Sequence, residues 1–301
     1  MILEGENRMY TIFDVNHFGI RASLQEIVPL AVRYGIGGVH VPAELLEDPA
    51  AAQETARFVL GSGLKWGLLP TPVDFFAEDV DDAAFAAGIE KLKAWASVGE
   101  QMGVRYAYNH VWNGSNTRMV AENYDWLVIR IRRVWRVLHE FGIQYGMEFL
   151  GAWPLQASFK YPFFNTLAGV LALADAVDPS CGFVFDSFHW YCGSHANPAD
   201  AYLAARLVDR MVNYHVNDGR PGRNFQEQQD LERALPLETG IIDAALPYRL
   251  FKANGYRGPV MCEPMQPWSM NADGKSLEAI IQAVAAAYQR LENASAPSFG
   301  G

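Results

Sequence analysis

Short apolar runs rich in β-branched and aromatic residues alternate with longer amphipathic stretches along the whole chain, and this alternation constrains the fold most strongly. The apolar runs are residues 10–15, 37–41, 65–69, 106–111, 144–149, 182–185, 212–216 and 259–262. The amphipathic stretches between and after them are residues 24–34, 51–60, 83–102, 122–141, 167–176, 199–208, 242–254 and 276–291. Strand and helix patterns that alternate in this number are typical of a closed parallel barrel. We therefore expect an α/β protein with a single (β/α)8 TIM barrel.

An open, doubly wound sheet is the alternative fold for alternating strands and helices. Such a sheet usually carries a glycine-rich phosphate turn after an early strand, and the sequence contains neither G-x-G-x-x-G nor G-x-x-x-x-G-K-[ST]. The length of 301 residues suits one barrel, and no linker divides the chain. We assign residues 1–292 to the barrel and the small, polar residues 293–301 to a flexible C-terminal tail.

Charge and composition argue against several classes of partner. The net charge is −10 and the basic residues form no run, whereas a nucleic-acid-binding protein usually shows a basic stripe. No apolar run is long enough to span a membrane, and residues 1–8 contain no apolar signal core. The three cysteines form no C-x-x-C pair, which is typical of buried thiols in a reducing compartment. We expect a cytoplasmic protein that binds a small molecule; a homo-oligomer is compatible with the sequence.

Four consecutive strand-like runs end in a carboxylate or an imidazole: Glu148, Asp186, His215 and Glu263. The carboxyl ends of parallel strands converge on one face of a barrel, where active sites lie. A carboxylate at such a position is costly unless it is hydrated, paired or bound to a cation. The sequence therefore predicts one divalent metal held by these residues. Three carboxylates and one imidazole favour Mn²⁺, and Mg²⁺, Co²⁺ or Zn²⁺ would also bind.

Further polar and aromatic residues follow the strand-like runs. His110 ends the fourth run and is a candidate substrate ligand, with a buried structural role as the alternative. Trp112 follows it, and an aromatic face there suits the C–H faces of a sugar, although ordinary loop packing explains it equally well. The long polar segment 220–237 is a candidate functional loop. Because it contains Arg220 and Arg223, a phosphorylated substrate remains an alternative to an unphosphorylated one.

Several motifs around these residues resemble the xylose isomerase-like TIM-barrel superfamily, and its sugar phosphate isomerase/epimerase branch in particular. They are Met-Glu-Phe-Leu-Gly at 147–151, Phe-Asp-Ser-Phe-His at 185–189, Tyr-His-Val-Asn-Asp at 214–218, Glu-Thr-Gly-Ile-Ile-Asp at 238–243 and Glu-Pro at 263–264. The resemblance covers the C-terminal half of the chain well and the N-terminal half only in architecture. These motifs are specific to the superfamily and not to one reaction.

The resemblance implies a role for each matching residue. Glu148, Asp186, His215 and Glu263 would be the metal ligands. Glu148 and Glu263 would also exchange protons with the substrate from opposite faces, through an enediolate formed next to a carbonyl. His189 would hydrogen-bond substrate oxygens. The superfamily places an arginine shortly after the metal-binding histidine, so Arg220 or Arg223 would contact the substrate.

Three other functions compete with a metal-dependent sugar isomerase or epimerase. A lyase or dehydratase acting on a keto-sugar, keto-inositol or keto-glycoside, including one that cleaves a C-glycoside, would use the same proton abstraction. An abasic-site endonuclease of the superfamily would need three zinc ions and further histidines that the segment after His215 lacks. A non-enzymatic sugar-binding module would have no need of two proton-transferring carboxylates on a metal.

Overall fold

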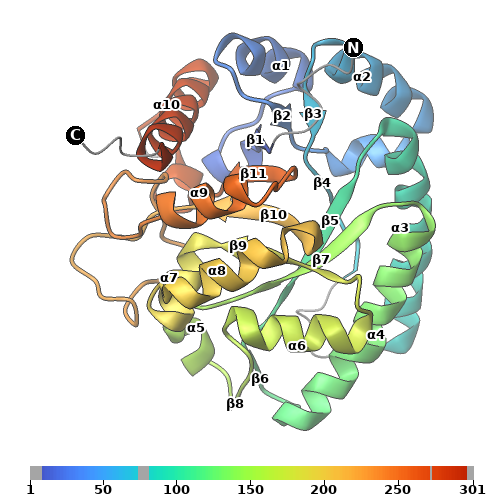
Figure 1. The fold of residues 1–301 in the computed structure, drawn as a ribbon. Helices are drawn as coiled ribbons and strands as arrows, with labels where there is room; N and C mark the ends of the chain where they lie inside the picture. Colours follow the sequence, from blue (N-terminus) through green and yellow to red (C-terminus); the bar gives the residue numbers. More distant parts are fainter. Residues whose placement is uncertain (1–8, 74–80, 272, 297–301) are drawn as a thin grey trace.

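The computed structural model describes residues 9–73, 81–271 and 273–296, and it shows a ring of parallel strands surrounded by helices (Figure 1). The main sheet has the order β3-β2-β1-β11-β10-β9-β7-β5-β4, and all of its neighbouring strands pair in parallel. In chain order the strands are β1 (Tyr10–Phe13), β2 (Gly38–Val39), β3 (Lys65–Trp66), β4 (Leu68–Leu69), β5 (Tyr106–Val111), β7 (Gln144–Phe149), β9 (Gly182–Asp186), β10 (Met211–Val216) and β11 (Pro259–Cys262). The expected single TIM barrel is confirmed.

The third strand of the barrel is split into β3 and β4 at Gly67. β3 pairs with β2 and β4 pairs with β5, so the two ends of the sheet order are joined through this one residue. A Cβ at Gly67 would lie 3.1 Å from Cδ1 of Ile12 and 3.3 Å from the carbonyl oxygen of Val39. Glycine therefore lets the chain pass close to its neighbours where the ring closes.

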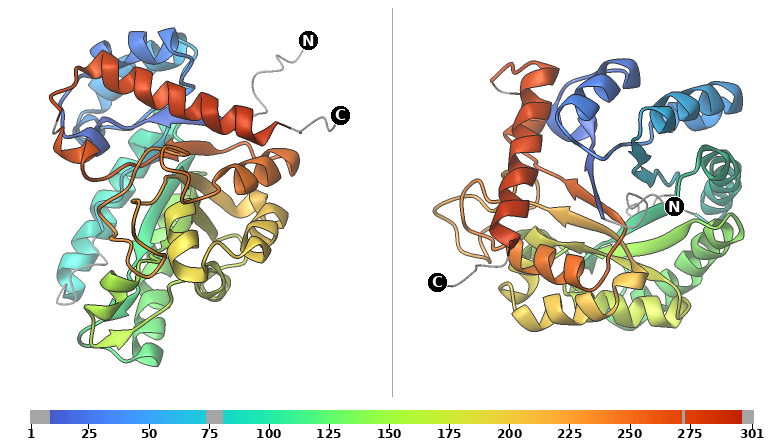
Figure 2. Two further views of the ribbon diagram at one scale, coloured as in Figure 1. Left: turned by 90° about the vertical axis from the view of Figure 1, so that its left-hand side faces the viewer. Right: turned by 45° about the horizontal axis from the view of Figure 1, so that its top comes forward.

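The expected helices are all present and lie outside the ring of strands (Figure 2). They are α1 (Leu24–Arg33), α2 (Pro49–Gly61), α3 (Asp82–Met102), α4 (Val120–Glu140), α6 (Leu167–Val177), α8 (Pro198–Arg206), α9 (Ala245–Ala253) and α10 (Leu277–Ser295). Asp81, Thr166 and Ser276 begin α3, α6 and α10 by accepting a main-chain N–H from the first turn. The apolar faces of the helices pack on the strands and form the core between the outer layer of helices and the inner ring of strands.

Short elements lie mainly in the segments that follow the strands. They are η1 (Val15–Phe18), η2 (Ala43–Glu47), β6 (Gly114–Ser115), α5 (Trp153–Ala157), β8 (Tyr161–Pro162), α7 (Ser187–Ser194), η3 (Val208–Arg210) and η4 (Trp268–Met270). The long segment between β10 and α9 is held by Asp218, whose buried carboxylate accepts N–H groups from residues 239–242. These segments form the face of the barrel on which the candidate site lies.

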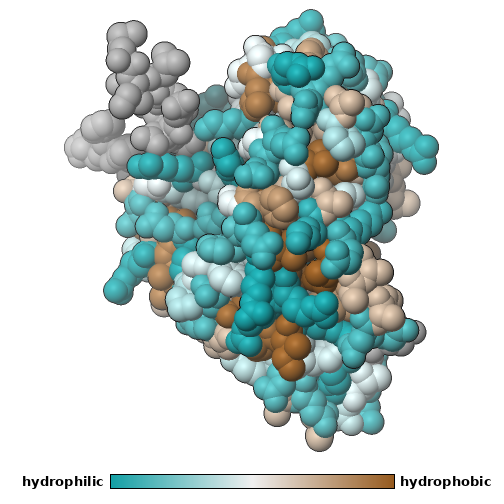
Figure 3. Space-filling model, turned by 90° about the vertical axis from the view of Figure 1, so that its right-hand side faces the viewer, coloured by the Kyte–Doolittle hydropathy of each residue, from teal (hydrophilic) through white to brown (hydrophobic). Residues whose placement is uncertain are grey.

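The last helix runs beyond the expected end at residue 291. α10 ends at Ser295, whose hydroxyl lies 3.4 Å from the carbonyl oxygen of Ala245. Residues 1–8 and most of the tail, residues 297–301, lie outside the described part of the chain. Figure 3 shows one face of the molecule, on which hydrophilic side chains predominate and hydrophobic ones form small groups. Within the described ranges, no helix combines the length and apolar character needed to cross a membrane.

Candidate metal centre and active-site cavity

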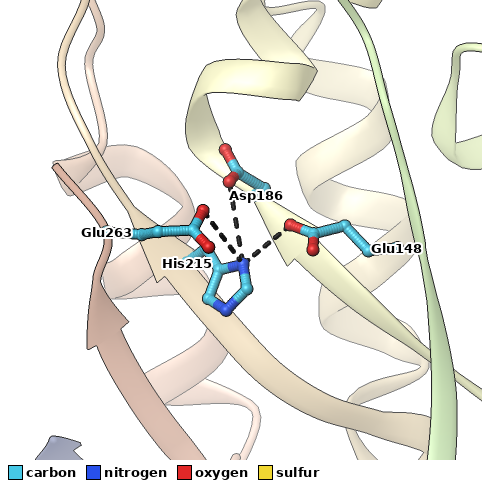
Figure 4. Close-up of side chains that lie close together, drawn as sticks. All are labelled: Glu148, Asp186, His215 and Glu263. Carbon is cyan, nitrogen blue, oxygen red and sulfur yellow. Dashed lines mark hydrogen bonds and ion pairs between the residues drawn. The ribbon is translucent and has the colours of Figure 1, made fainter. Parts of the chain in front are cut away.

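Four polar side chains converge at one end of the barrel, as the sequence predicts. Glu148 lies on β7, Asp186 ends β9, His215 lies on β10, and Glu263 directly follows β11. Each contributes one ligand atom to a group whose members all lie within 4.8 Å of one another. All four residues are buried, and their side chains point toward a common centre (Figure 4).

The imidazole of His215 faces all three carboxylates through one nitrogen. Its Nδ1 lies 2.7 Å from Oε1 of Glu148, 3.7 Å from Oδ2 of Asp186 and 3.7 Å from Oε2 of Glu263. The other ring nitrogen, Nε2, is buried without a hydrogen-bond partner among the described residues. The ring is thus oriented by the carboxylates and presents Nδ1 to the centre of the group.

Burial and charge act against each other in this group. Burial alone would lower the pKa of His215, but Glu148 and Glu263 outweigh it and raise that pKa to about 9. Burial alone would raise the pKa of Glu148 and of Glu263, but positive neighbours, foremost His215, hold both below their ordinary values. At Asp186 burial prevails and raises the pKa. The imidazole is therefore protonated at neutral pH in the metal-free chain, and a metal held by this group would have to displace that proton.

The donor set and its spacing fit one divalent metal. Ligands on opposite sides of a small dication are roughly 4 to 5 Å apart, which agrees with the 4.8 Å span of the four atoms. Three hard carboxylate oxygens and one imidazole nitrogen suit Mn²⁺, Mg²⁺, Co²⁺ or Zn²⁺. Three buried carboxylates so close together also need positive charge to offset their repulsion. The group therefore has the chemistry of a mononuclear metal centre.

Arg233, which was not predicted from the sequence, also reaches the carboxylates. Its Nη1 lies 2.6 Å from Oε2 of Glu263 and 3.0 Å from Oδ2 of Asp186, and its Nη2 lies 3.0 Å from Oδ1 of Asp230. The side chain is buried, and its guanidinium lies 4.7 Å from the ring centroid of Phe188. In the sequence, only its position in the long segment after β10 indicated a functional role for Arg233. Arg220 and Arg223, in the same segment, are nearer to His215 along the chain.

Those two arginines are engaged elsewhere. The main-chain N–H of Arg220 donates to Oε1 of Gln228, and the guanidinium of Arg223 forms an ion pair of 2.9 Å with Glu232. Within the described parts of the chain, neither has a hydrogen bond or ion pair to the four-residue group. The arginine that the structure places at the centre is thus Arg233, and substrate contact by Arg220 stays a prediction.

His189 lies beside the carboxylate group and is not one of its four members. Its main-chain N–H donates to Oδ1 of Asp186, and its Nδ1 accepts the N–H of Gly151. Its Nε2 lies 3.1 Å from Nη2 of Arg233 and 3.7 Å from Oδ1 of Asp230. A Cβ at Gly151 would lie 2.0 Å from the carbonyl oxygen of His189, so glycine is required for this close approach. His189 is held in place next to Arg233.

Two histidines contact the glutamates of the group from the side of a cavity. Nε2 of His110 lies 3.1 Å from Oε2 of Glu148, and Nε2 of His17 lies 4.0 Å from Oε1 of Glu263. Burial alone would lower the pKa of His110, but the charge and hydrogen bond of Glu148 raise it. Both imidazoles line the cavity. His110 and His17 therefore both lie between the cavity and the carboxylate group, and substrate contact by His110 stays a prediction.

The cavity has a volume of about 640 Å³ and lies over the ends of the first barrel strands. Polar side chains on its wall include Asp14, Asn16, Thr71 and Asn109. Its volume falls in the usual range for small-molecule sites, roughly 300 to 1,000 Å³. Trp112, a predicted substrate ligand, is not among its described lining residues and packs edge-on against Phe159, with ring centroids 5.4 Å apart. A small polar ligand in this cavity would meet His110 and His17, the two imidazoles that lie beside Glu148 and Glu263.

The chain is similar in sequence and in structure to known proteins with this fold. Residues 28–288 match the sequence model of a family described as xylose isomerase-like TIM barrel. A xylose isomerase domain protein from Alicyclobacillus acidocaldarius subsp. acidocaldarius has a similar structure, with a TM-score of 0.79 and 24% identity over 95% of this chain and 99% of that one. No curated protein matches the chain significantly.

Two further solved structures are similar in the same way. The IOLI protein with a bound zinc atom has a TM-score of 0.77 and 18% identity over 96% of this chain and all (100%) of its own. D-psicose 3-epimerase with D-tagatose, from Clostridium cellulolyticum H10, has a TM-score of 0.71 and 14% identity over 95% of this chain and 99% of its own. At these identities the likeness establishes the fold of the chain and leaves its reaction to the site.

Proposed function

The chain belongs to the xylose isomerase-like TIM-barrel family, and from that premise we propose that it is a divalent-metal-dependent isomerase or epimerase acting on a sugar or keto-sugar. One observation carries the proposal: two glutamates of the metal group, Glu148 and Glu263, each contact a histidine that lines the adjoining cavity. The epimerase among the structural neighbours supports the same class of reaction. A substrate in the cavity would be separated from each of the two glutamates by one imidazole at most.

The reaction proposed is the movement of a proton next to a carbonyl. A bound divalent metal would act as a Lewis acid that offsets negative charge on the substrate oxygens. One glutamate removes the proton from the carbon and the other returns a proton to the same carbon or to its neighbour, which decides between epimerase and isomerase. Both carboxyl groups have pKa values below their ordinary values and are therefore ionised at neutral pH, as a base must be.

The residues around the glutamates have separate tasks in this proposal. His110, hydrogen-bonded to Glu148 at the cavity wall, would orient that carboxylate and bind a substrate oxygen. Arg233, with His189 beside it, would hold Asp186 and Glu263 in position. We propose Mn²⁺ as the metal because oxygen ligands predominate; the neighbour with zinc leaves Zn²⁺ as the competing metal.

Solvent exchange tests the proposal directly. The chain loaded with Mn²⁺ would be incubated in deuterated water with a panel of free ketoses and keto-sugars, and the carbon-bound protons would be followed by NMR. We expect deuterium to enter next to the carbonyl and the product to have the mass of the substrate apart from that exchange. Loss of water or of an aglycone would instead identify a lyase, and binding without exchange across the panel would indicate a sugar-binding protein.

A further inference from the structure

A second cavity, of about 660 Å³, adjoins the first at the same end of the barrel. It is formed by the segments that follow β1 and β2, and the two cavities share Asn16 and His40 on their walls. Segments that follow barrel strands build the substrate sites of TIM-barrel enzymes. The candidate site is therefore not one hollow but two that meet at a histidine.

His40 is the feature that points to a ligand at this junction. Its side chain lines both cavities, only 9% of the residue is exposed, and its Nδ1 is buried without a hydrogen-bond partner among the described residues. Its main chain is fixed, since its N–H donates to the carbonyl oxygen of Phe13. A buried polar atom left without a partner costs about 1 to 3 kcal/mol. A ligand that crosses from one cavity to the other would pass against this imidazole.

The wall of the second cavity is amphipathic and nearly balanced in charge. Its apolar lining residues include Val15, Leu24 and Leu45. Its uncharged polar lining residues include Ser23, Gln25 and Thr55. One cation, Arg21, and one carboxylate, Glu44, are its charged members. Apolar surface beside hydroxyl and amide groups suits a sugar ring, which presents C–H faces and hydroxyls together. Balanced charge favours a neutral ring over a phosphate group.

We propose that the second cavity is a subsite for a second sugar ring, so that the preferred substrate is a glycosylated ketose and not a free monosaccharide. This inference rests on the proposed function of the first cavity, which would hold the reacting ring beside Glu148 and Glu263. His40 would donate to or accept from an oxygen near the glycosidic link, since it lies where the cavities meet. The linkage position that the site accepts is then set by the path past His40 and Asn16.

The test compares binding of one ring with binding of two. Isothermal titration calorimetry on the Mn²⁺-loaded chain would use D-fructose and four glucosyl-fructose disaccharides, linked through O3, O4, O5 or O6 of fructose. We expect at least one disaccharide to bind about tenfold or more tightly than fructose. Ala22→Trp, which fills the second cavity alone, should remove that advantage, and His40→Phe, which keeps a ring but removes both nitrogens, should reduce it. Ala94→Trp, on the exposed side of α3, is the matched control and should change neither affinity.

The outcomes separate this inference from the proposed function. If no disaccharide binds more tightly than fructose, or if Ala22→Trp leaves a tighter disaccharide unaffected, the second subsite is refuted. If the disaccharide binds selectively and Ala22→Trp abolishes that selectivity, but no ligand exchanges its carbon-bound protons with solvent, the subsite stands and the proton-transfer function fails. Exchange with fructose alone, without a disaccharide preference, supports the function and refutes the subsite.

Discussion

The guanidinium of Arg233 lies 2.6 Å from Oε2 of Glu263, while the other oxygen of that carboxylate faces His17 at the cavity. One glutamate thus joins a buried cation on one side to the cavity on the other. Arg233 also pairs with Asp186, so a single arginine offsets two of the three carboxylates in the group. The same carboxylates are the proposed ligands of a divalent metal, which would supply positive charge at the same place.

Replacement of Arg233 should therefore destabilise the chain mainly when metal is absent. Arg233→Met removes the guanidinium that pairs with Asp186 and Glu263, and breaking buried pairs in this way typically costs about 3 to 5 kcal/mol. Thermal unfolding measured in chelator should show a lowered Tm, and saturating Mn²⁺ should recover much of the loss. Arg223→Met, which removes a half-buried ion pair outside the group, is the control and should change Tm little in either condition. An Arg233→Met chain as stable as the wild type in chelator would contradict the electrostatic account.

One tightly held divalent metal per chain is expected. Four ligand atoms within 4.8 Å of one another leave room for a single ion. Elemental analysis of protein purified without chelator measures the stoichiometry, and Asp186→Ala should reduce it, since it removes a ligand. Three zinc ions per chain would contradict a mononuclear centre and favour the endonuclease branch of the superfamily.

His189→Ala should retain the metal while it weakens substrate binding or turnover. The ring contacts Gly151 and Arg233 and lies outside the four-residue group, so its loss removes a hydrogen-bonding side chain without removing a ligand. Metal content and KM measured on the same preparation distinguish the two effects. A variant that has lost its metal would show that His189 belongs to the ligand set.

Asp218→Asn should lower the free energy of unfolding without a direct effect on the metal group. The buried carboxylate accepts main-chain N–H groups from Gly219 and from residues 239–242, and an amide nitrogen in its place would face donors. Buried donors left without acceptors cost about 1 to 3 kcal/mol each, and partial rearrangement makes a total of about 2 to 4 kcal/mol reasonable. Urea unfolding of the wild type and of Asp218→Asn measures this difference in the free energy of unfolding. Asp175→Asn, at an exposed ion pair with Arg210, is the control and should stay within about 0.5 kcal/mol of the wild type.

The barrel and its four converging side chains were accessible from sequence because both follow from local pattern. Strand-like runs and helical periodicity give the order of elements, and the carboxyl ends of parallel strands share one face, so Glu148, Asp186, His215 and Glu263 were placed together without coordinates. Arg233 was not predicted, because its position depends on how a long segment folds back through Asp218 over the barrel. Such closure involves residues far apart in sequence and leaves no periodic signal.

Smaller differences have the same origin. The split of the third strand at Gly67 depends on the close approach of neighbouring strands, and the extension of α10 to Ser295 depends on packing beside α9. Trp112 follows a strand as predicted, but it packs against Phe159 and does not line the described cavity. Which side of a loop faces a cavity is decided by tertiary contacts, and residue type alone does not reveal it.

The central claim is that Glu148 and Glu263 transfer protons as well as bind metal, and Glu→Gln changes at each position test it most directly. Glutamine keeps the size and one oxygen ligand but removes the base, so each Mn²⁺-saturated variant should lose turnover and solvent deuterium exchange by at least about 10²-fold. Glu238→Gln, at a glutamate outside the metal group, is the matched control and should exchange at the wild-type rate. The decisive measurement is the rate of deuterium entry next to the substrate carbonyl in fully metallated Glu263→Gln protein. The account predicts a rate at least about a hundredfold below wild type; a near-normal rate would contradict the two-carboxylate mechanism.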